Sequence, residues 1–144
     1  MNAGIVVGIE GTPAGRAALE WAMREGMLRG RPVTVVHACG QPFGREVRAM
    51  SDVEARRAST CMLDSAVAEA ERAVGGKPEI IERSRHVAAA KILLEEAQDA
   101  ELLVLGRGHR LSVVDVVGQS VSAECVRHAP CPVVIIPGSA ATSP

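Results

Sequence analysis

The residues best suited to chemistry follow an apolar run near the carboxyl end of the chain. This run, residues 102–105, is typical of a buried strand, and it leads into a glycine-bearing loop at residues 106–118. A short helix is predicted to follow at residues 120–128. Backbone N–H groups point outward where a strand ends in glycines and enters a helix, with the positive end of the helix dipole behind them. The segment therefore indicates a site that suits phosphate.

Charged side chains in the same loop allow two interpretations. Arg107, His109 and Arg110 are able to meet a triphosphate tail, whereas Asp115 is able to do so only through a metal ion. The alternative is that all of these are solvated loop charges. Ser120 has the same two interpretations, because a serine that begins a helix serves equally well as its N-cap.

Cys125 and His128 are the residues that most resemble a nucleophile and its base. They are three residues apart on the last predicted helix and can therefore face each other. Nucleophilic catalysis also needs a group that orients the base, and the sequence marks neither that group nor an oxyanion hole. The loop has no lysine of the kind that a P-loop uses. We therefore expect a binding protein rather than an enzyme.

Composition excludes several classes of partner. The net charge of −1 gives no general attraction to nucleic acid or to an anionic membrane, and one Phe, one Trp and no Tyr leave few rings on which bases could stack. No apolar run approaches the roughly 20 residues of a membrane span, and the first residues lack the features of a signal peptide. We expect a cytoplasmic protein that binds neither nucleic acid nor membrane.

Cysteine and histidine spacing predicts no metal site and no disulfide framework. The cysteines are scattered without a CxxC pair, and histidines do not cluster with them. We expect reduced thiols that are buried for structural reasons. The cysteines are Cys39, Cys61, Cys125 and Cys131.

The elements that must position the loop alternate along the chain between strands and helices. Apolar runs predict strands at residues 5–9, 33–38, 79–83, 102–105 and 132–136, the third being polar enough for a sheet edge. Helical periodicity predicts helices at residues 13–30, about 45–74, 87–98 and 120–128. Thr12 and Pro13 are a strong start signal for the first helix. Such alternation predicts an α/β fold with a parallel, doubly wound sheet.

Ligands of such sheets bind beyond the carboxyl ends of the strands, where the strand order reverses. Three predicted loops follow strands that reach this edge, at residues 10–12, 38–44 and 106–118. We therefore expect these loops to form the binding site.

The sequence resembles the universal stress protein family along nearly its whole length. The resemblance is carried by IVVGIEGTPAGRAALEWAMREGMLRGRPVTVVHA, by ELLVLG and by SVSAECVRHAPCPVVIIP. It implies a three-layer, Rossmann-like fold with a five-stranded parallel sheet in the order 3-2-1-4-5. It also implies one domain at residues 1–138, followed by a tail at 139–144, and a homodimer. One branch of the family binds ATP.

That branch carries the pattern G-x2-G-x9-G-[ST] after the fourth strand, where glycines let the backbone close around phosphates. Counted without gaps, the pattern falls here on Gly106, His109, Gln119 and Ser120, which keeps one glycine. Counted with a one-residue deletion and a compensating insertion, it falls on Gly106, Gly108, Gly118, Gln119 and Ser120, which keeps all three. We prefer the second alignment.

The resemblance also implies an adenine side of the site. The Asp that the family places after the first strand corresponds to Glu10, whose side chain is one methylene longer. Backbone groups around His37 and Ala38 would meet the adenine edge, while the His37 side chain is expected to pack at the strand end. The expected nucleotide-binding residues are Glu10, Ala38, Gly106, Gly108, His109, Gly118, Gln119, Ser120, Val121 and Ser122.

Two functional hypotheses follow. The first is a stress-response module that binds ATP, with or without Mg²⁺, through an altered phosphate loop. The alternative is a family member that binds no nucleotide and acts as a dimeric interaction protein. Its interface would be the apolar last strand, formed by Val133, Val134, Ile135 and Ile136.

Overall fold

The computed structural model describes residues 4–10, 13–38, 52–85, 87–107 and 121–137. The strands are β1 (Ile5–Gly8), β2 (Val33–Ala38), β3 (Ile80–Arg85), β4 (Leu102–Gly106) and β5 (Val133–Ile136). The helices are α1 (Pro13–Arg29), α2 (Asp52–Val74), α3 (Ala89–Glu96) with the 3₁₀ turn η1 (Ala97–Asp99), and α5 (Val121–His128). These elements confirm the predicted alternation.

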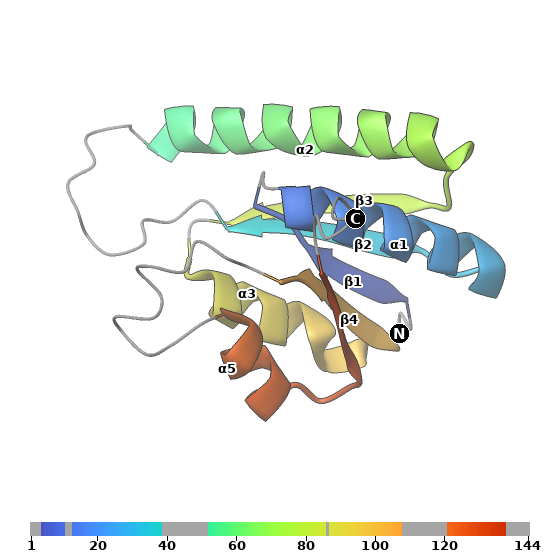
Figure 1. Cartoon of the computed structure of the whole chain (residues 1–144). Coiled ribbons are helices and arrows are strands. Elements are labelled where there is room, and N and C mark those ends of the chain that lie inside the picture. The colour runs from blue at the N-terminus through green and yellow to red at the C-terminus, as the bar shows by residue number, and fades with distance from the viewer. Residues whose placement is uncertain (1–3, 11–12, 39–51, 86, 108–120, 138–144) are drawn as a thin grey trace.

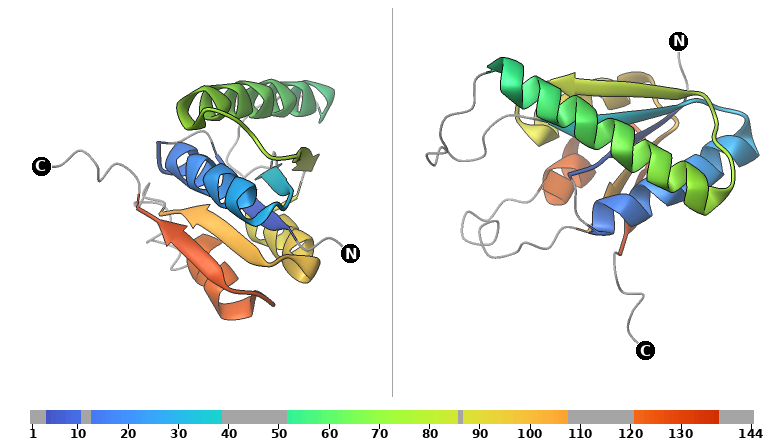
Figure 2. Two further views of the ribbon diagram at one scale, coloured as in Figure 1. Left: turned by 90° about the vertical axis from the view of Figure 1, so that its right-hand side faces the viewer. Right: turned by 90° about the horizontal axis from the view of Figure 1, so that it is seen from above.

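The five strands form one parallel sheet in the order β3-β2-β1-β4-β5, as the resemblance implies. Helices α1 and α2 cover one face of the sheet, and α3 and α5 cover the other (Figures 1 and 2). This arrangement follows from right-handed crossovers on either side of β1, because the chain winds outward from β1 first in one direction and then in the other.

Each face of the sheet has its own apolar core. Ile5 and Val7 of β1 pack with Leu19 of α1 and Leu63 of α2, whereas Val6 belongs to the opposite core. Successive strand residues point to opposite faces, so a run of apolar residues serves both cores at once. The second core also contains Leu103, Leu105, Ile92, Leu93 and Cys125.

Several details differ from the predictions. Helix α2 is described from Asp52, so the predicted helical residues 45–51 lie outside the described residues, and so does the predicted tail at 139–144. Leu28 recurs at helical spacing with the apolar residues of α1, which predicts that it faces the core, but it is 82% exposed. It lies two residues beyond the buried Gly26, which places it about 200° around the helix axis from that buried position. The predicted helix at 87–98 is shorter, and its buried Ile92 was not anticipated.

Candidate functional site

The two central strands separate at their carboxyl ends. Strand β1 pairs with β4 only as far as Val7 and Val104 among the described residues. Beyond that point the Ile9 N–H donates to the Val36 carbonyl of β2 at 3.0 Å, and the Arg107 N–H donates to β5 at 2.8 Å. The pairing of β1 with β2 and of β4 with β5 therefore continues past the point where the pairing of β1 with β4 ends. This divergence lies at the point where strand order reverses, which is where open parallel sheets bind ligands.

Three of the predicted site residues lie at this edge. Glu10 follows β1 and is exposed, Ala38 ends β2 and is half-buried, and Gly106 ends β4. The parallel registers bring the three strand ends to the same edge of the sheet. Five of the remaining predicted residues lie outside the described residues, so their positions stay predictions: Gly108, His109, Gly118, Gln119 and Ser120.

Gly106 has a packing role that the sequence does not reveal. A Cβ atom at this position would lie 2.4 Å from the Ala14 carbonyl oxygen and 2.9 Å from the Ala14 Cβ. Only glycine therefore lets the end of β4 approach the first turn of α1 this closely. The glycine by itself is not evidence for phosphate, but the contact brings the amino-terminal turn of α1 to the candidate site.

The first residues of α5 lie beside a different hollow. Val121 is 41% exposed, and Ser122 is half-buried. Ser122 lines an open hollow of about 500 Å³ between α5 and β5, together with Ala123, Val126, Arg127 and Ile135. Glu10, Ala38 and Gly106 do not line it. This hollow is therefore distinct from the edge where β1 and β4 separate.

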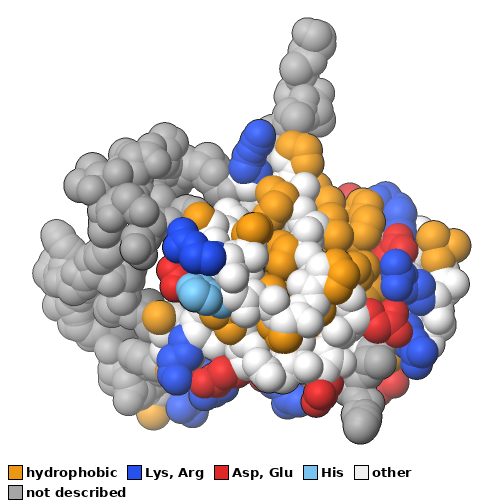
Figure 3. Space-filling view, turned by 90° about the horizontal axis from the view of Figure 1, so that it is seen from below, with side chains coloured by type: hydrophobic (Ala, Val, Ile, Leu, Met, Phe, Trp, Pro, Cys, Tyr) orange, Lys and Arg blue, Asp and Glu red, His pale blue; other side chains and the backbone are white. Residues whose placement is uncertain are grey.

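Apolar side chains gather in the middle of the face that carries α3 and α5, with charged side chains around them (Figure 3). Val126 and Ile135 contribute to the apolar surface, with exposed fractions of 59% and 37%. This surface lies next to β5, whose outer side has no neighbouring strand among the described residues. An exposed apolar surface beside this strand fits the expectation from the sequence that β5 is an edge able to pair with another chain.

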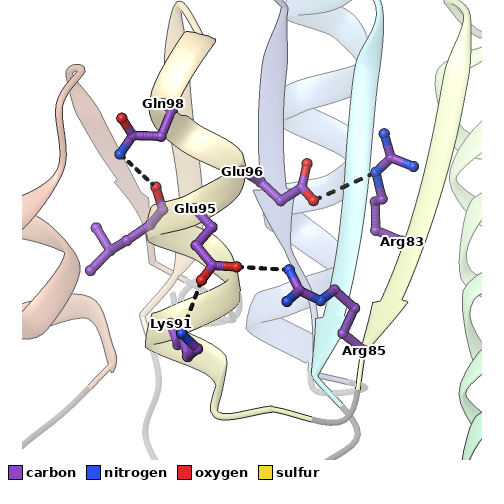
Figure 4. A network of polar contacts seen from close by, with 7 residues as sticks. Arg83, Arg85, Lys91, Glu95, Glu96 and Gln98 are labelled. Atoms are coloured by element: carbon purple, nitrogen blue, oxygen red, sulfur yellow. Dashed lines mark hydrogen bonds and ion pairs between the residues drawn. The ribbon is translucent and has the colours of Figure 1, made fainter.

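Basic residues at the opposite edge of the sheet are paired with carboxylates of α3 (Figure 4). Arg85 Nη1 lies 2.8 Å from Glu95 Oε1, and Arg83 Nε lies 3.5 Å from Glu96 Oε2. Lys91 and Arg85 both hold the pKa of Glu95 below its ordinary value. Arg83 and Arg85 are thus occupied in joining β3 to α3, whereas the exposed Arg107 follows β4 at the candidate site.

A hydrogen-bonded chain of three side chains joins α2 to the ends of β2 and β3. Ser84 Oγ donates to Ser59 Oγ at 2.6 Å, and Ser59 Oγ lies 2.6 Å from His37 Nδ1. Burial lowers the pKa of His37, and Ser59 is 2% exposed. The packing of His37 was predicted, but its partners were missed. Ser59 lies one turn before Leu63 on the inner stripe of α2, and a polar residue on an apolar stripe is the signal that could have found it.

The cysteines fit a structural role only in part. Cys125 is buried, as expected, and burial followed by the charge of Glu124 raises the pKa of its thiol to about 11. A thiol so strongly protonated is a poor nucleophile, which disfavours the pair with His128. Cys61 was expected to be buried but is exposed, and Cys131 is half-buried. Within the described ranges no three His, Cys, Asp or Glu residues gather as a metal site.

Comparisons with known proteins agree with this fold. The model of the universal stress protein family matches residues 1–137. A universal stress protein of Mycobacterium tuberculosis is 34% identical over 144 residues, covering 92% of this chain and 47% of that protein. The chain thus spans about half the length of this curated relative. In the part of the chain that the structure describes, no helix is long and apolar enough to cross a membrane.

Two solved structures of universal stress proteins have a fold similar to that of this chain. A universal stress protein in complex with cAMP matches with a TM-score of 0.74 and 22% identity, over 94% of this chain and 96% of its own. The universal stress protein from Archaeoglobus fulgidus in complex with dAMP matches with a TM-score of 0.64 and 26% identity, over 93% of this chain and 97% of its own. The match of the family model over residues 1–137 shows that this chain belongs to the universal stress protein family.

Proposed function

We propose that the chain is an adenine-nucleotide-binding module, with ATP as its ligand and stress signalling as its role. The observation that carries the proposal is the separation of β1 from β4 beyond Val7 and Val104, with Glu10 and Gly106 directly beyond it. Similar proteins in complex with cAMP and dAMP support an adenine nucleotide as the ligand class. Mg²⁺ would accompany ATP through its phosphates rather than through a dedicated protein site.

Each described residue at this edge has a role in the proposal. The exposed carboxylate of Glu10 is available to accept hydrogen bonds from the ribose or the adenine amino group. Ala38 offers backbone groups to the adenine edge, and Arg107 offers a guanidinium to phosphate. The predicted loop residues Gly108, Gly118 and Ser120 would complete the phosphate side.

The direct test is to denature the purified protein and to look for released adenine nucleotide by chromatography. The ligand preference of the protein is then measured by titration with ATP, with and without Mg²⁺, and with AMP, cAMP and GTP. A ligand that binds only the folded state stabilises it by about 2.7 kcal/mol at a hundredfold excess over Kd. Adenine nucleotides should therefore raise the melting temperature, and GTP should not. No released nucleotide and no shift with any adenine nucleotide would rule out the proposal.

Two matched variants locate the site. Arg107→Gln should weaken the binding of ATP more than the binding of adenosine, because it removes a side chain that is proposed to contact phosphate. Arg24→Gln is the control, since Arg24 is an exposed arginine on α1 that only approaches Glu20 at 4.0 Å. An equal loss of ATP affinity in the two variants would place the phosphate-binding residues elsewhere. We also propose that bound ATP is not turned over, which a chromatographic assay of the incubated complex checks.

The second candidate function, a dimeric interaction protein, rests on the difference between the two sheet edges. Strand β5 is entirely apolar and Ile135 is 37% exposed, whereas β3 carries Glu82, Arg83 and Arg85. Charged residues on an edge strand discourage pairing with another chain, and an apolar edge favours it. The proposed homodimer therefore forms through β5.

Light scattering after size exclusion tests the dimer. Ile135→Lys should give a monomer, while Glu82→Lys on the opposite edge should leave the mass unchanged. A dimer that survives Ile135→Lys would place the interface elsewhere. A dimer that binds no adenine nucleotide would favour the second candidate over the first.

A further inference from the structure

The helix layer formed by α3 and α5 is open on the outer side of α5. Helix α5 packs against α3 and against β5. The hollow of about 500 Å³ lies between α5 and β5, and no further helix lines it among the described residues. Helices normally cover both faces of a parallel sheet. The hollow therefore has the position that the next helix of this layer would take.

The walls of the hollow are mainly apolar. Val133 packs in the core beneath α3 and α5, and Ile135, two residues further along β5, points to the same face. On α5, Val126 lies one turn after Ser122, and both line the hollow. Val126 is 59% exposed and Ile135 is 37% exposed. Covering such a surface with apolar side chains of a partner is favourable.

One charged side chain, Arg127, lines the hollow. Arg127 is exposed and has no ion pair among the described residues, whereas the arginines of β3 are paired with carboxylates of α3. Glu124 is the only acidic residue of α5, and it lies about 200° around the helix axis from Val126. It does not line the hollow. The charge that would complement the hollow is therefore negative.

A second copy of this chain does not supply that charge through β5. Residues 130–137, which include β5, contain no Asp or Glu. Pairing of two β5 edges about a two-fold axis would also bring a second Arg127 to the same face of the joined sheet. The better complement is a segment of another protein that carries both apolar side chains and carboxylates.

We propose that the hollow between α5 and β5 is a docking site for an acidic amphipathic helix of a partner protein. The apolar stripe of that helix covers Val126 and Ile135, and a carboxylate beside the stripe pairs with Arg127. Recognition of this kind uses apolar anchors spaced three and four residues apart. The hollow lies apart from the edge where β1 and β4 separate, so docking does not depend on nucleotide binding.

Two designed peptides serve as probes. Each is an alanine-based helix of about 18 residues with a stripe of leucines, because shorter helices are marginal in water. One peptide carries glutamates beside the stripe, and the other carries lysines at the same positions. NMR titration of the full chain, up to millimolar peptide, follows the backbone amides.

The glutamate peptide should shift the amides of residues 122–127 and of Ile135. The lysine peptide should bind about fivefold more weakly or worse, because repulsion replaces an exposed ion pair. No shift of these amides with the glutamate peptide would overturn the proposal. Equal affinity for the two peptides would also overturn it, because the hollow would then select for apolar residues alone.

Charge reversal at Arg127 tests the assigned contact. Arg127→Glu should reverse the preference, so that the lysine peptide binds more tightly than the glutamate peptide. Arg24→Glu is the control, because Arg24 is an exposed arginine of α1, which covers the opposite face of the sheet. It should keep the preference of the wild-type protein. A preference for glutamate that survives Arg127→Glu would contradict the proposed pairing.

Val126→Asp tests the apolar part of the site. Val126 is exposed already, so the variant should fold, and its new carboxylate should abolish binding of the glutamate peptide. Val53→Asp is the matched control, because Val53 is a valine of α2 that is 64% exposed. It should bind the peptide as the wild-type protein does. An equal loss in the two variants would mean that the peptide does not recognise this hollow.

Two other occupants of the hollow would give different results. Shifts of the same amides on dilution of the protein without peptide would assign the hollow to a second copy of the chain. Peptide binding that appears only after removal of residues 138–144 would assign the hollow to the end of this chain. Either result would overturn the proposal of a partner helix and would leave the proposed nucleotide site unaffected.

Discussion

Gly106 ends β4 where that strand meets the first turn of α1. The glycines of this segment first suggest a phosphate loop, but comparison with the nucleotide-binding branch of the family weakens that interpretation, because the glycine spacing differs. Gly106 has a second reason to be glycine, because a Cβ atom there would lie 2.4 Å from the Ala14 carbonyl oxygen. A sequence pattern cannot separate the two reasons, because both need an absent side chain.

Gly106→Ala should destabilise the protein by about 1–3 kcal/mol, the usual cost of forcing extra atoms into a packed contact. Gly76→Ala is the control, because its Cβ would meet only Met27 Sδ at 3.5 Å. Urea denaturation of both variants measures the difference. Equal midpoints for the two would show that β4 and α1 adjust without strain.

His37 and Ser59 illustrate what remained unpredicted at this scale. The position of His37 at a strand end could be read from its apolar neighbours. Its hydrogen bond to Ser59 depends on how α2 lies across β2, over a separation of 22 residues. Periodicity along one element carries no information about such a contact between elements.

Cys125 should make stability fall at high pH. Its thiol has a pKa raised from 9.0 to about 11 in the folded protein, so the unfolded chain loses the proton first. Stability is therefore complete below about pH 9 and decreases as the pH rises toward 11. Urea midpoints at pH 8 and pH 10.5 should differ more for the wild-type protein than for Cys125→Ala. An equal decrease in both proteins would contradict the assignment to Cys125.

The helices were predicted best where they carry a long apolar stripe. Helix α2 has Leu63, Val67 and Ala70 buried at the predicted spacing. In α1 the same reasoning included Leu28, because an apolar residue near the end of a stripe looks like its continuation. The structure places Leu28 off the stripe, about 200° around the helix axis from the buried Gly26. Apolar residue type alone is weak evidence of burial, since many apolar side chains remain on protein surfaces.

Two leucine substitutions should distinguish a buried position on an apolar stripe from an exposed position that only looks like part of one. Leu63 is 1% exposed, so Leu63→Ala should cost about 2–5 kcal/mol through lost burial and the cavity left behind. Leu28 is 82% exposed, and Leu28→Ala should stay within about 0.5 kcal/mol of the wild type. Chemical denaturation measures both. A large loss for Leu28→Ala would mean that a partner covers this residue in solution.

The whole molecule is organised around β1, from which the chain winds outward in both directions. Alternating strands and helices are enough to predict a parallel sheet, but the strand order came from the family resemblance. The order determines where β1 and β4 separate and hence where Glu10 and Gly106 lie relative to each other. For the loop residues 108–120 the prediction still rests on the sequence pattern, because they lie outside the described residues.

Hydrogen exchange should reveal this organisation as a gradient of protection across the sheet. Strand β1 lies between β2 and β4, and Val7 and Val104 are fully buried, so amides of both strands should exchange only through global unfolding. Among the described residues, strand β3 has a neighbouring strand on one side only and is partly exposed, so its amides should exchange through smaller openings.

Strand β5 is the informative case, because it has the same edge position as β3 but an apolar sequence. In a monomer the two edges should be protected to a similar degree. In a dimer paired through β5, the outward amides of Val133–Ile136 gain partners and should exchange more slowly than those of β3. Ile135→Lys should then return β5 to the rate of β3. Amide exchange measured by NMR at several protein concentrations tests this. Slow exchange of β5 that is unchanged by dilution and by Ile135→Lys would show that the protection arises within one chain.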